Sequence, residues 1–150
     1  MYAKALVAID GSDFARHALQ HIPRLGPREV VLVAVMESVA AAMRRQTGVV
    51  ADIPADIAKQ VEAREVLELR RHLRDAREEL DVRGWSGPVT QLVRHGKAGQ
   101  QIVAVAAEES CDIVVLATHG RTGIRRALLG SVADYVISHV AGAAVLLVRP

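Results

Sequence analysis

The sequence predicts an α/β fold in which an open parallel sheet of five strands carries helices on both faces. Short apolar runs alternate with longer segments of helical period, as expected when each strand is followed by a covering helix. Four of the five runs are nearly solid with Val, Ile, Leu and Ala, which is typical of strands buried on both faces. The length of 150 residues suits one domain, so we expect a single domain over residues 1–150.

The expected strands follow from the positions of the apolar runs. They cover residues 4–9, 30–35, 89–94, 112–116 and 144–148. The third run is more mixed, because Thr90, Gln91 and Arg94 interrupt its apolar residues. We therefore place the third strand at an edge of the sheet, where one side meets water.

The expected helices lie between these strands. Apolar residues recur at helical spacing from Ala15 to Leu25 behind Ser12, a favourable N-cap, and this predicts the first helix. The second covers residues 58–80, with an apolar stripe opposite a charged, solvated face. The third covers residues 98–108, and the fourth covers residues 131–139 and ends before Gly142.

The segment from residue 36 to residue 57 is long for a connection between strand and helix. Gly48 and Pro54 argue against one regular helix through it. Arg44 and Arg45 could reach toward a phosphate from this segment. A solvated loop or a piece of dimer surface is the alternative.

Composition excludes several classes of protein. Cys111 is the only cysteine, so the sequence allows no internal disulfide, and we expect a buried apolar role for it. The formal charge is +2, from 19 basic and 17 acidic residues interspersed along the chain, and aromatic residues make up 3%, so nucleic-acid binding is not indicated. No apolar run approaches the roughly 20 residues that span a bilayer, and no secretory signal is visible, which predicts a cytoplasmic protein without a membrane segment.

The loops that follow the strands carry the functional signal, because ligands of open parallel sheets bind outside the carboxyl ends of the strands. Asp10 and Gly11 follow the first strand, and residues 117–131 follow the fourth. Glycines there let a phosphate approach backbone N–H groups, and Ser131 opens a helix whose N-terminus attracts an anion. A ligand-free alternative exists, since Ser131 and Asp134 also fit a capping box.

This loop resembles the ATP-binding loop of the universal stress proteins, written Gly-x2-Gly-x9-Gly followed by Ser or Thr. Here it reads Ala117-x2-Gly120-x9-Gly130-Ser131. The similarity extends over the chain, with Asp10 ending the first strand, Gly96 following the third, and an apolar closing strand at residues 145–148. The resemblance implies a Rossmann-like fold, of the kind shared with adenine nucleotide alpha hydrolases, in an ATP-binding regulatory protein of the stress response.

The resemblance also implies a set of site residues. The phosphates would lie on Gly120, Gly130, Ser131 and Val132, the ribose by Asp10 and Ala117, and the adenine by Val35; Ile9, Leu116 and Arg121 complete the expected site. The expected ligand is ATP, ADP or AMP, with Mg²⁺ as the accompanying ion. Ala117 departs from the pattern and puts a methyl group where the family has a glycine. The family resemblance further implies a homodimer through the last strand, whose edge would otherwise be exposed.

A catalytic role is not predicted. His119 and Arg121 could act as an acid or base and a charge clamp, but a structural hydrogen bond and simple charge neutralisation are the favoured explanations. The Gly-Lys-Ser/Thr end of a P-loop is absent, and the histidines show no metal-ligand spacing. Two alternatives to a nucleotide-binding regulator stay open: a nucleotide-free dimeric stress protein of the same fold, and a slow ATPase or adenylyl-transfer enzyme.

Overall fold

The computed structural model describes residues 1–48, 52–118 and 129–149. The strands are β1 (Lys4–Ala8), β2 (Glu29–Met36), β3 (Val89–His95), β4 (Ile113–Ala117) and β5 (Ala144–Val148). The helices are α1 (Asp13–Leu19), α2 (Ile22–Leu25), α3 (Val39–Thr47), α4 (Ala55–Val82), α5 (Ala98–Glu108) and α6 (Ser131–His139). Each expected strand is present, with ends within one residue of the predicted ones.

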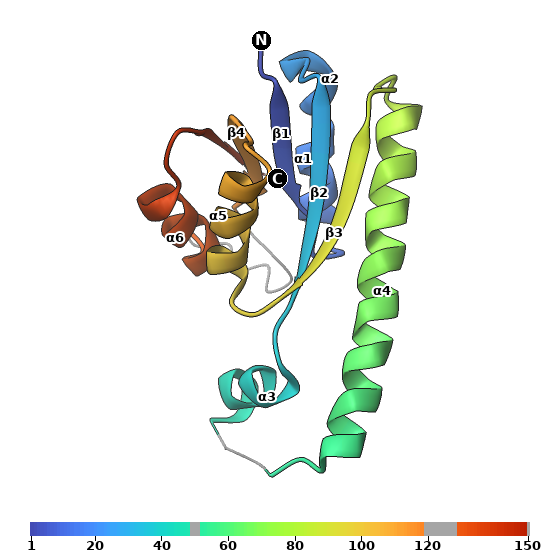
Figure 1. Cartoon of the computed structure of the whole chain (residues 1–150), viewed down its shortest axis with the longest axis vertical. Coiled ribbons are helices and arrows are strands. Elements are labelled where there is room, and N and C mark those ends of the chain that lie inside the picture. The colour runs from blue at the N-terminus through green and yellow to red at the C-terminus, as the bar shows by residue number, and fades with distance from the viewer. Residues whose placement is uncertain (49–51, 119–128, 150) are drawn as a thin grey trace.

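The five strands form one parallel sheet in the order β3-β2-β1-β4-β5 (Figure 1). The central strand β1 places Ala5 opposite Val30 of β2 on one side and opposite Ile113 of β4 on the other. The prediction that the third strand lies at an edge is confirmed. The chain moves outward from β1 to β3 and then crosses to β4, so the strand order reverses between β1 and β4.

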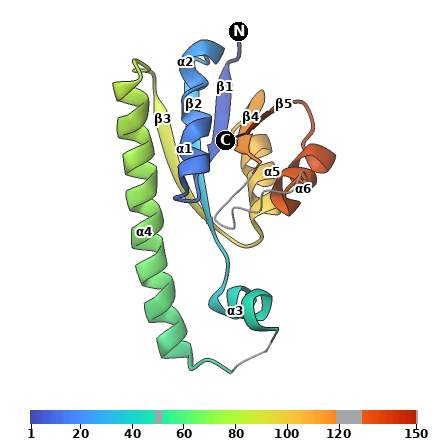
Figure 2. The ribbon, with the colours of Figure 1, turned by 180° about the vertical axis from the view of Figure 1, so that it is seen from behind.

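Helices α1 and α4 cover one face of the sheet, as Figure 2 shows from behind. Alternate residues of each strand point into this layer, because successive side chains of a strand face opposite sides. On β1 these are Ala5 and Val7, and Ile9 just after the strand continues the same row. The helices contribute the apolar residues Ala18, Leu19, Leu69, Leu73, Ala76 and Leu80.

Helices α5 and α6 cover the opposite face and meet the other set of strand residues. Leu6 and Val33 face this layer, together with Leu116. Ile102 and Val105 of α5 and Val136 of α6 are buried against them. Cys111 belongs to this layer as predicted, and burial raises the pKa of its thiol to about 11.

The first predicted helix is interrupted. The periodic stretch from Ala15 to Leu25 forms two helices, α1 and α2, instead of one. Pro23 explains the break, because a proline has no N–H to donate and its ring would collide with the carbonyl of Leu19 four residues earlier. The predicted N-cap is confirmed, since Ser12 Oγ accepts the N–H of Ala15 at 3.1 Å.

The segment from residue 36 to residue 57 contains helix α3, which the sequence did not predict. Ser38 caps its start by accepting the N–H of Ala41 at 3.2 Å, and Gly48 ends it in a left-handed conformation with φ 68°. Helix α3 lies beyond the carboxyl ends of the strands, next to the first turns of α4 (Figure 1). The prediction that Gly48 and Pro54 prevent one continuous helix is confirmed.

Helix α4 is the longest helix, at 28 residues, and starts three residues earlier than predicted. Only its second half is anchored in the core, where Leu69, Leu73, Ala76 and Leu80 are buried. Its first half extends past the sheet toward α3 (Figure 1). Among the described residues, no helix is long and apolar enough to cross a membrane.

An ion-pair cluster links α4 to α1 on this face. The carboxylate of Glu79 accepts a hydrogen bond from Arg16 Nε at 2.7 Å and another from Arg83 Nη2 at 2.6 Å. Partial burial acts to raise the pKa of Glu79, but the hydrogen bonds from Arg83 and Arg16 outweigh it and hold the pKa below its usual value. The cluster therefore stabilises the folded state most when Glu79 is ionised.

Replacing Leu73 tests how far the sheet depends on α4. Leu73→Ala should lower the free energy of unfolding by about 2 to 5 kcal/mol, because Leu73 is 1% exposed and its loss leaves a cavity. The control Leu67→Ala lies on the same helix but is 69% exposed, and it should change stability by less than about 0.5 kcal/mol. Urea unfolding followed by circular dichroism measures both. Equal effects would show that α4 is not anchored as described.

The Glu79 cluster predicts a pH dependence. Because the pKa of Glu79 is lowered in the folded state, its contribution is complete above the usual pKa of a glutamate and is lost as the pH falls through the lower, folded value. Glu79→Gln should cost about 1 kcal/mol at pH 7, since Arg16 is half-exposed, and much less at pH 3. Glu78→Gln, on the exposed face of the same helix, should show no such change. A pH-independent cost for Glu79→Gln would contradict this account.

Candidate functional site

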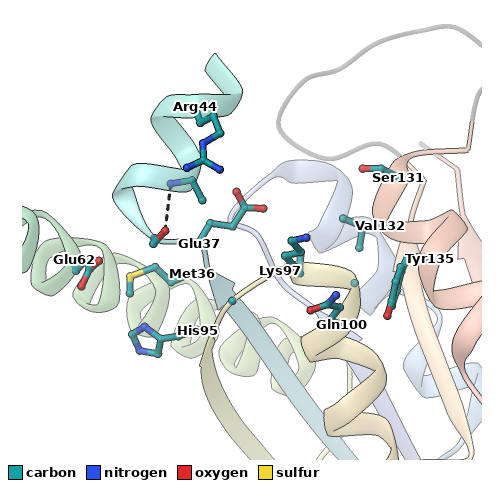
Figure 3. Close-up of a pocket in the computed structure, with 15 residues that line it drawn as sticks. Met36, Glu37, Arg44, Glu62, His95, Lys97, Gln100, Ser131, Val132 and Tyr135 are labelled. Atoms are coloured by element: carbon teal, nitrogen blue, oxygen red, sulfur yellow. Dashed lines mark hydrogen bonds between the residues drawn. The ribbon is translucent and has the colours of Figure 1, made fainter. Parts of the chain in front are cut away.

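A cavity of about 830 Å³ opens at the carboxyl ends of β2 and β3. Met36 and His95 end these two strands and line the cavity, and α3, α5 and α6 contribute the remaining walls together with Glu62 of α4. Figure 3 shows Arg44 of α3 on one side and Ser131 and Val132 of α6 on another. The cavity therefore lies where ligands of open parallel sheets bind.

Helix α6 starts at this cavity without a side-chain cap. Gly130 is the N-cap residue and Ser131 is the first helical residue, so the predicted capping box between Ser131 and Asp134 is wrong. A capping box requires a Ser or Thr hydroxyl at the N-cap position, and Ser131 lies one residue after the N-cap. The Ser131 side chain is exposed, and the N-cap residue Gly130 offers no side chain to accept the first N–H groups of α6.

Gly130 fits tightly against the end of β4. A Cβ atom at this position would lie 3.3 Å from the carbonyl oxygen of Thr118. Because the backbone of residue 130 has an ordinary φ of −60°, it is this contact, and not backbone strain, that favours glycine. Gly130 thus holds the start of α6 close to the carboxyl end of β4.

Helix α5 also starts at the cavity without a side-chain cap. Its N-cap is Lys97, which follows Gly96, a residue with φ 131° that a side chain would strain. Gly99 in the first turn lies against the ring of Tyr135, where a Cβ would approach within 2.9 Å. The first turns of α5 and α6 are therefore packed together and line the same space.

The tip of β1 is braced internally. The Asp10 Oδ1 atom accepts the N–H of Ser12 at 2.9 Å and also the hydroxyl of Ser12, which in turn caps α1. Ile9 and Gly11 line a separate hollow of about 190 Å³ beside α4, and the ring of His72 packs over Gly11. This packing leaves no room for a side chain at residue 11.

The predicted site residues fall into three groups. Ser131 and Val132 line the large cavity, and Gly130 precedes them. A second group lies at or near the carboxyl ends of β1, β2 and β4, with Ile9 and Leu116 buried in the core and Asp10, Val35 and Ala117 half-buried. Gly120 and Arg121, like the side chain of Arg45, lie outside the described residues.

Several cavity residues were not predicted as site residues. They come from α3 and from the β3–α5 connection, and include Glu37, Arg44, His95, Lys97 and Tyr135. Gly96 and Arg44 were the available signals, because the first follows a strand and the second lies in an unusually long segment. Among the described residues, no group of three or more His, Cys, Asp or Glu side chains could hold a metal ion.

The arrangement favours an anionic ligand with an apolar part. Two helix N-termini and two cationic side chains, Arg44 and Lys97, face the cavity. Met36, Ala41, Ala98 and Val132 supply apolar surface between them. Such a mixture suits a molecule that joins a flat apolar group to phosphate.

The chain is similar to proteins of one known family over almost its whole length. A family model described as the universal stress protein family matches residues 1–149. The universal stress protein MJ0577 of Methanocaldococcus jannaschii is 29% identical over 147 residues, which cover 91% of this chain and 89% of that protein. The solved structure of MJ0577 is similar to this one with a TM-score of 0.81 and 25% identity, over 100% of this chain and 97% of that chain.

Two more distant solved structures share the fold. A universal stress protein in complex with cAMP has a TM-score of 0.65 and 20% identity, covering 99% of this chain and 97% of its own. A family member from Arabidopsis thaliana with AMP bound has a TM-score of 0.63 and 14% identity, covering 98% and 91%. With the family model matching almost the whole length, this chain belongs to the universal stress protein family.

Proposed function

We propose that this protein binds an adenine nucleotide, with ATP as the main ligand, and acts as a cytoplasmic regulatory protein of the stress response. The observation that carries the proposal is the start of α6, which has Gly130 and no side-chain cap at its N-cap position and whose first residue, Ser131, lines a cavity of about 830 Å³. Relatives of the same fold have been solved with AMP and with cAMP. An uncapped helix start of this kind favours a phosphate group.

The dimensions and surface of the cavity support a nucleotide. Its volume lies within the range of about 300 to 1,000 Å³ that is usual for small-molecule sites. The phosphates would lie on the N–H groups of Ser131 and Val132, and the Ser131 hydroxyl would donate a further hydrogen bond. Asp10 follows β1 and Ala117 ends β4, the two neighbouring strands between which the strand order reverses, which suits the proposed ribose position.

The other proposed ligands and roles follow from the same site. ADP and AMP share the adenosine and the first phosphate, so they are alternative ligands of the same cavity. Mg²⁺ would accompany ATP on the phosphate oxygens, where it usually keeps several waters. We assign no catalytic residue, and turnover under saturating Mg-ATP separates a slow ATPase from a binding protein.

Substitutions at the start of α6 test nucleotide binding. Nucleotide at about 100 times its dissociation constant stabilises a native protein by about 2.7 kcal/mol, which raises Tm by roughly 5 to 10 °C at this size. Gly130→Val should abolish this shift, because a side chain there pushes α6 away from the Thr118 carbonyl. Ser131→Ala should lose only part of it, since the backbone donors remain. Thermal unfolding with and without Mg-ATP measures both effects.

The controls separate binding from folding. Ser131 is not a capping residue, so Ser131→Ala should leave Tm unchanged without nucleotide. Ser138→Ala, at the other end of α6, removes an exposed hydroxyl that bonds only the Asp134 carbonyl and should keep the full shift. If wild type shows no shift at millimolar Mg-ATP, or if Gly130→Val retains it, the proposal is wrong.

We also propose a homodimer through β5. This strand forms an edge of the sheet and pairs with β4 on one side only. The Ala144 N–H donates to the Asp112 carbonyl at 2.9 Å, so by alternation the N–H groups of Val145 and Leu147 point away from β4. An apolar edge with outward-facing backbone donors favours pairing with another strand.

A pair of proline substitutions tests this interface. Val145→Pro removes an outward-facing N–H and should shift the protein toward monomer while keeping the fold, because proline is tolerated on the outer side of an edge strand. Ala144→Pro removes the donor to Asp112 and should instead destabilise the sheet. Light scattering gives the mass and circular dichroism the fold. An unchanged dimer mass for a folded Val145→Pro variant would exclude this interface.

A further inference from the structure

Two cationic side chains reach the cavity from elements outside the glycine-rich loop. Arg44 belongs to α3, and Lys97 precedes α5 at the end of the β3 connection. Figure 3 shows them on different walls of the cavity, with the α6 residues Ser131 and Val132 on a third side. These cations therefore surround the space next to the proposed phosphate-binding helix start.

Neither cation forms an ion pair with an acid in the described part of the chain. Arg16, Arg83 and Arg94 each form an ion pair with a glutamate, whereas Arg44 and Lys97 form none with any described residue. Both side chains are exposed at the cavity. Two cations without an ion-pair partner, beside two helix starts, favour an anionic group close to them.

The acids of the cavity restrict where an anion can lie. Glu62 lines the wall formed by α4, away from Ser131 in Figure 3. Glu37 follows β2, and in the view of Figure 3 its carboxylate lies between Arg44 and Lys97; it also has an interaction of its own. Phosphate oxygens are repelled by carboxylates, so a phosphate chain must approach Lys97 and Arg44 from the α6 side of Glu37.

We infer that Arg44 and Lys97 are specificity-determining residues that bind the outer phosphates of the nucleotide and make the site prefer ATP to AMP. The inference rests on the proposed nucleotide binding. AMP has a single phosphate, which the start of α6 alone can hold. ATP has two more phosphates with additional negative charge, and guanidinium and ammonium groups form charge-assisted hydrogen bonds with such oxygens.

The test compares affinities for ATP, AMP and inorganic tripolyphosphate by calorimetry. Wild type should bind ATP more tightly than AMP. Arg44→Gln and Lys97→Gln should each weaken ATP binding by about fivefold, the magnitude of an exposed charge pair, and the double variant by about 25-fold. AMP affinity should change by less than about twofold. Tripolyphosphate, which has no nucleoside, should lose affinity in the same variants.

Matched variants control for net charge and chemistry. Arg70→Gln combined with Arg74→Gln removes two exposed cations of α4 that do not line the cavity, and should leave the ratio of ATP to AMP affinity unchanged. Arg44→Lys and Lys97→Arg keep the charge and should keep most of the ATP preference. Raising the salt concentration should weaken ATP binding in wild type more than in the double variant.

The outcomes separate this inference from the proposed function. If wild type binds ATP and AMP equally, or if the Gln variants weaken both alike, the inference is wrong while nucleotide binding stands. If tripolyphosphate binds and is insensitive to both substitutions, the inference is also overturned. If neither ATP nor AMP binds at millimolar concentration, the proposed function fails, and the inference fails with it.

Discussion

The parallel pairing of β1 with both β2 and β4 is the constraint on which the rest of the molecule depends. The carboxylate of Asp112 accepts the N–H groups of Ala3 at 2.7 Å and Lys4 at 2.9 Å, and the Asp112 N–H donates to the Lys4 carbonyl. These bonds fix the register of β4 on β1. Because all strands run the same way, every strand ends at one edge of the sheet. The loops and helix starts that line the cavity are therefore brought together at that edge by the sheet.

Secondary structure could be predicted where burial on the sheet sets the pattern. The strands were predicted within one residue, because buried strands exclude nearly all polar residues. The errors lie where local chemistry competes with periodicity. Pro23 divides a stretch whose apolar spacing continues through it, and the serine of α6 stands one position after the N-cap. None of the described side chains of α3 is buried, so hydrophobic periodicity gave no signal for this helix, and its capping serine and terminal glycine were the marks available.

The candidate site could be predicted only in part, for a related reason. Glycine and serine at the start of α6 form a recognisable local pattern, so Gly130 and Ser131 were found from the sequence. The opposite walls consist of ordinary residues such as Arg44, Lys97 and Tyr135, whose role depends on which segments the fold brings together. Lys97 is far from α3 in the sequence, and only the order of strands puts the ends of β2 and β3 side by side. A cavity lined by several strand–helix connections leaves no single sequence motif from which it could be predicted.

The helices on the two faces of the sheet are anchored in different ways. This difference determines how nucleotide binding could affect the proposed dimer. On one face, α4 is fixed by buried leucines and by the Glu79 ion pairs, far from the cavity. On the other, α5 and α6 begin at the cavity and pack on each other through Gly99 and Tyr135. Helix α6 ends at His139, and the edge strand β5 begins only five residues later, at Ala144. A single helix of nine residues thus connects the proposed phosphate position with the proposed dimer edge. A ligand held at the first turn of α6 therefore contacts the element that leads directly into β5, whereas α4 reaches the cavity through Glu62 and lies next to β2 and β3 rather than β5.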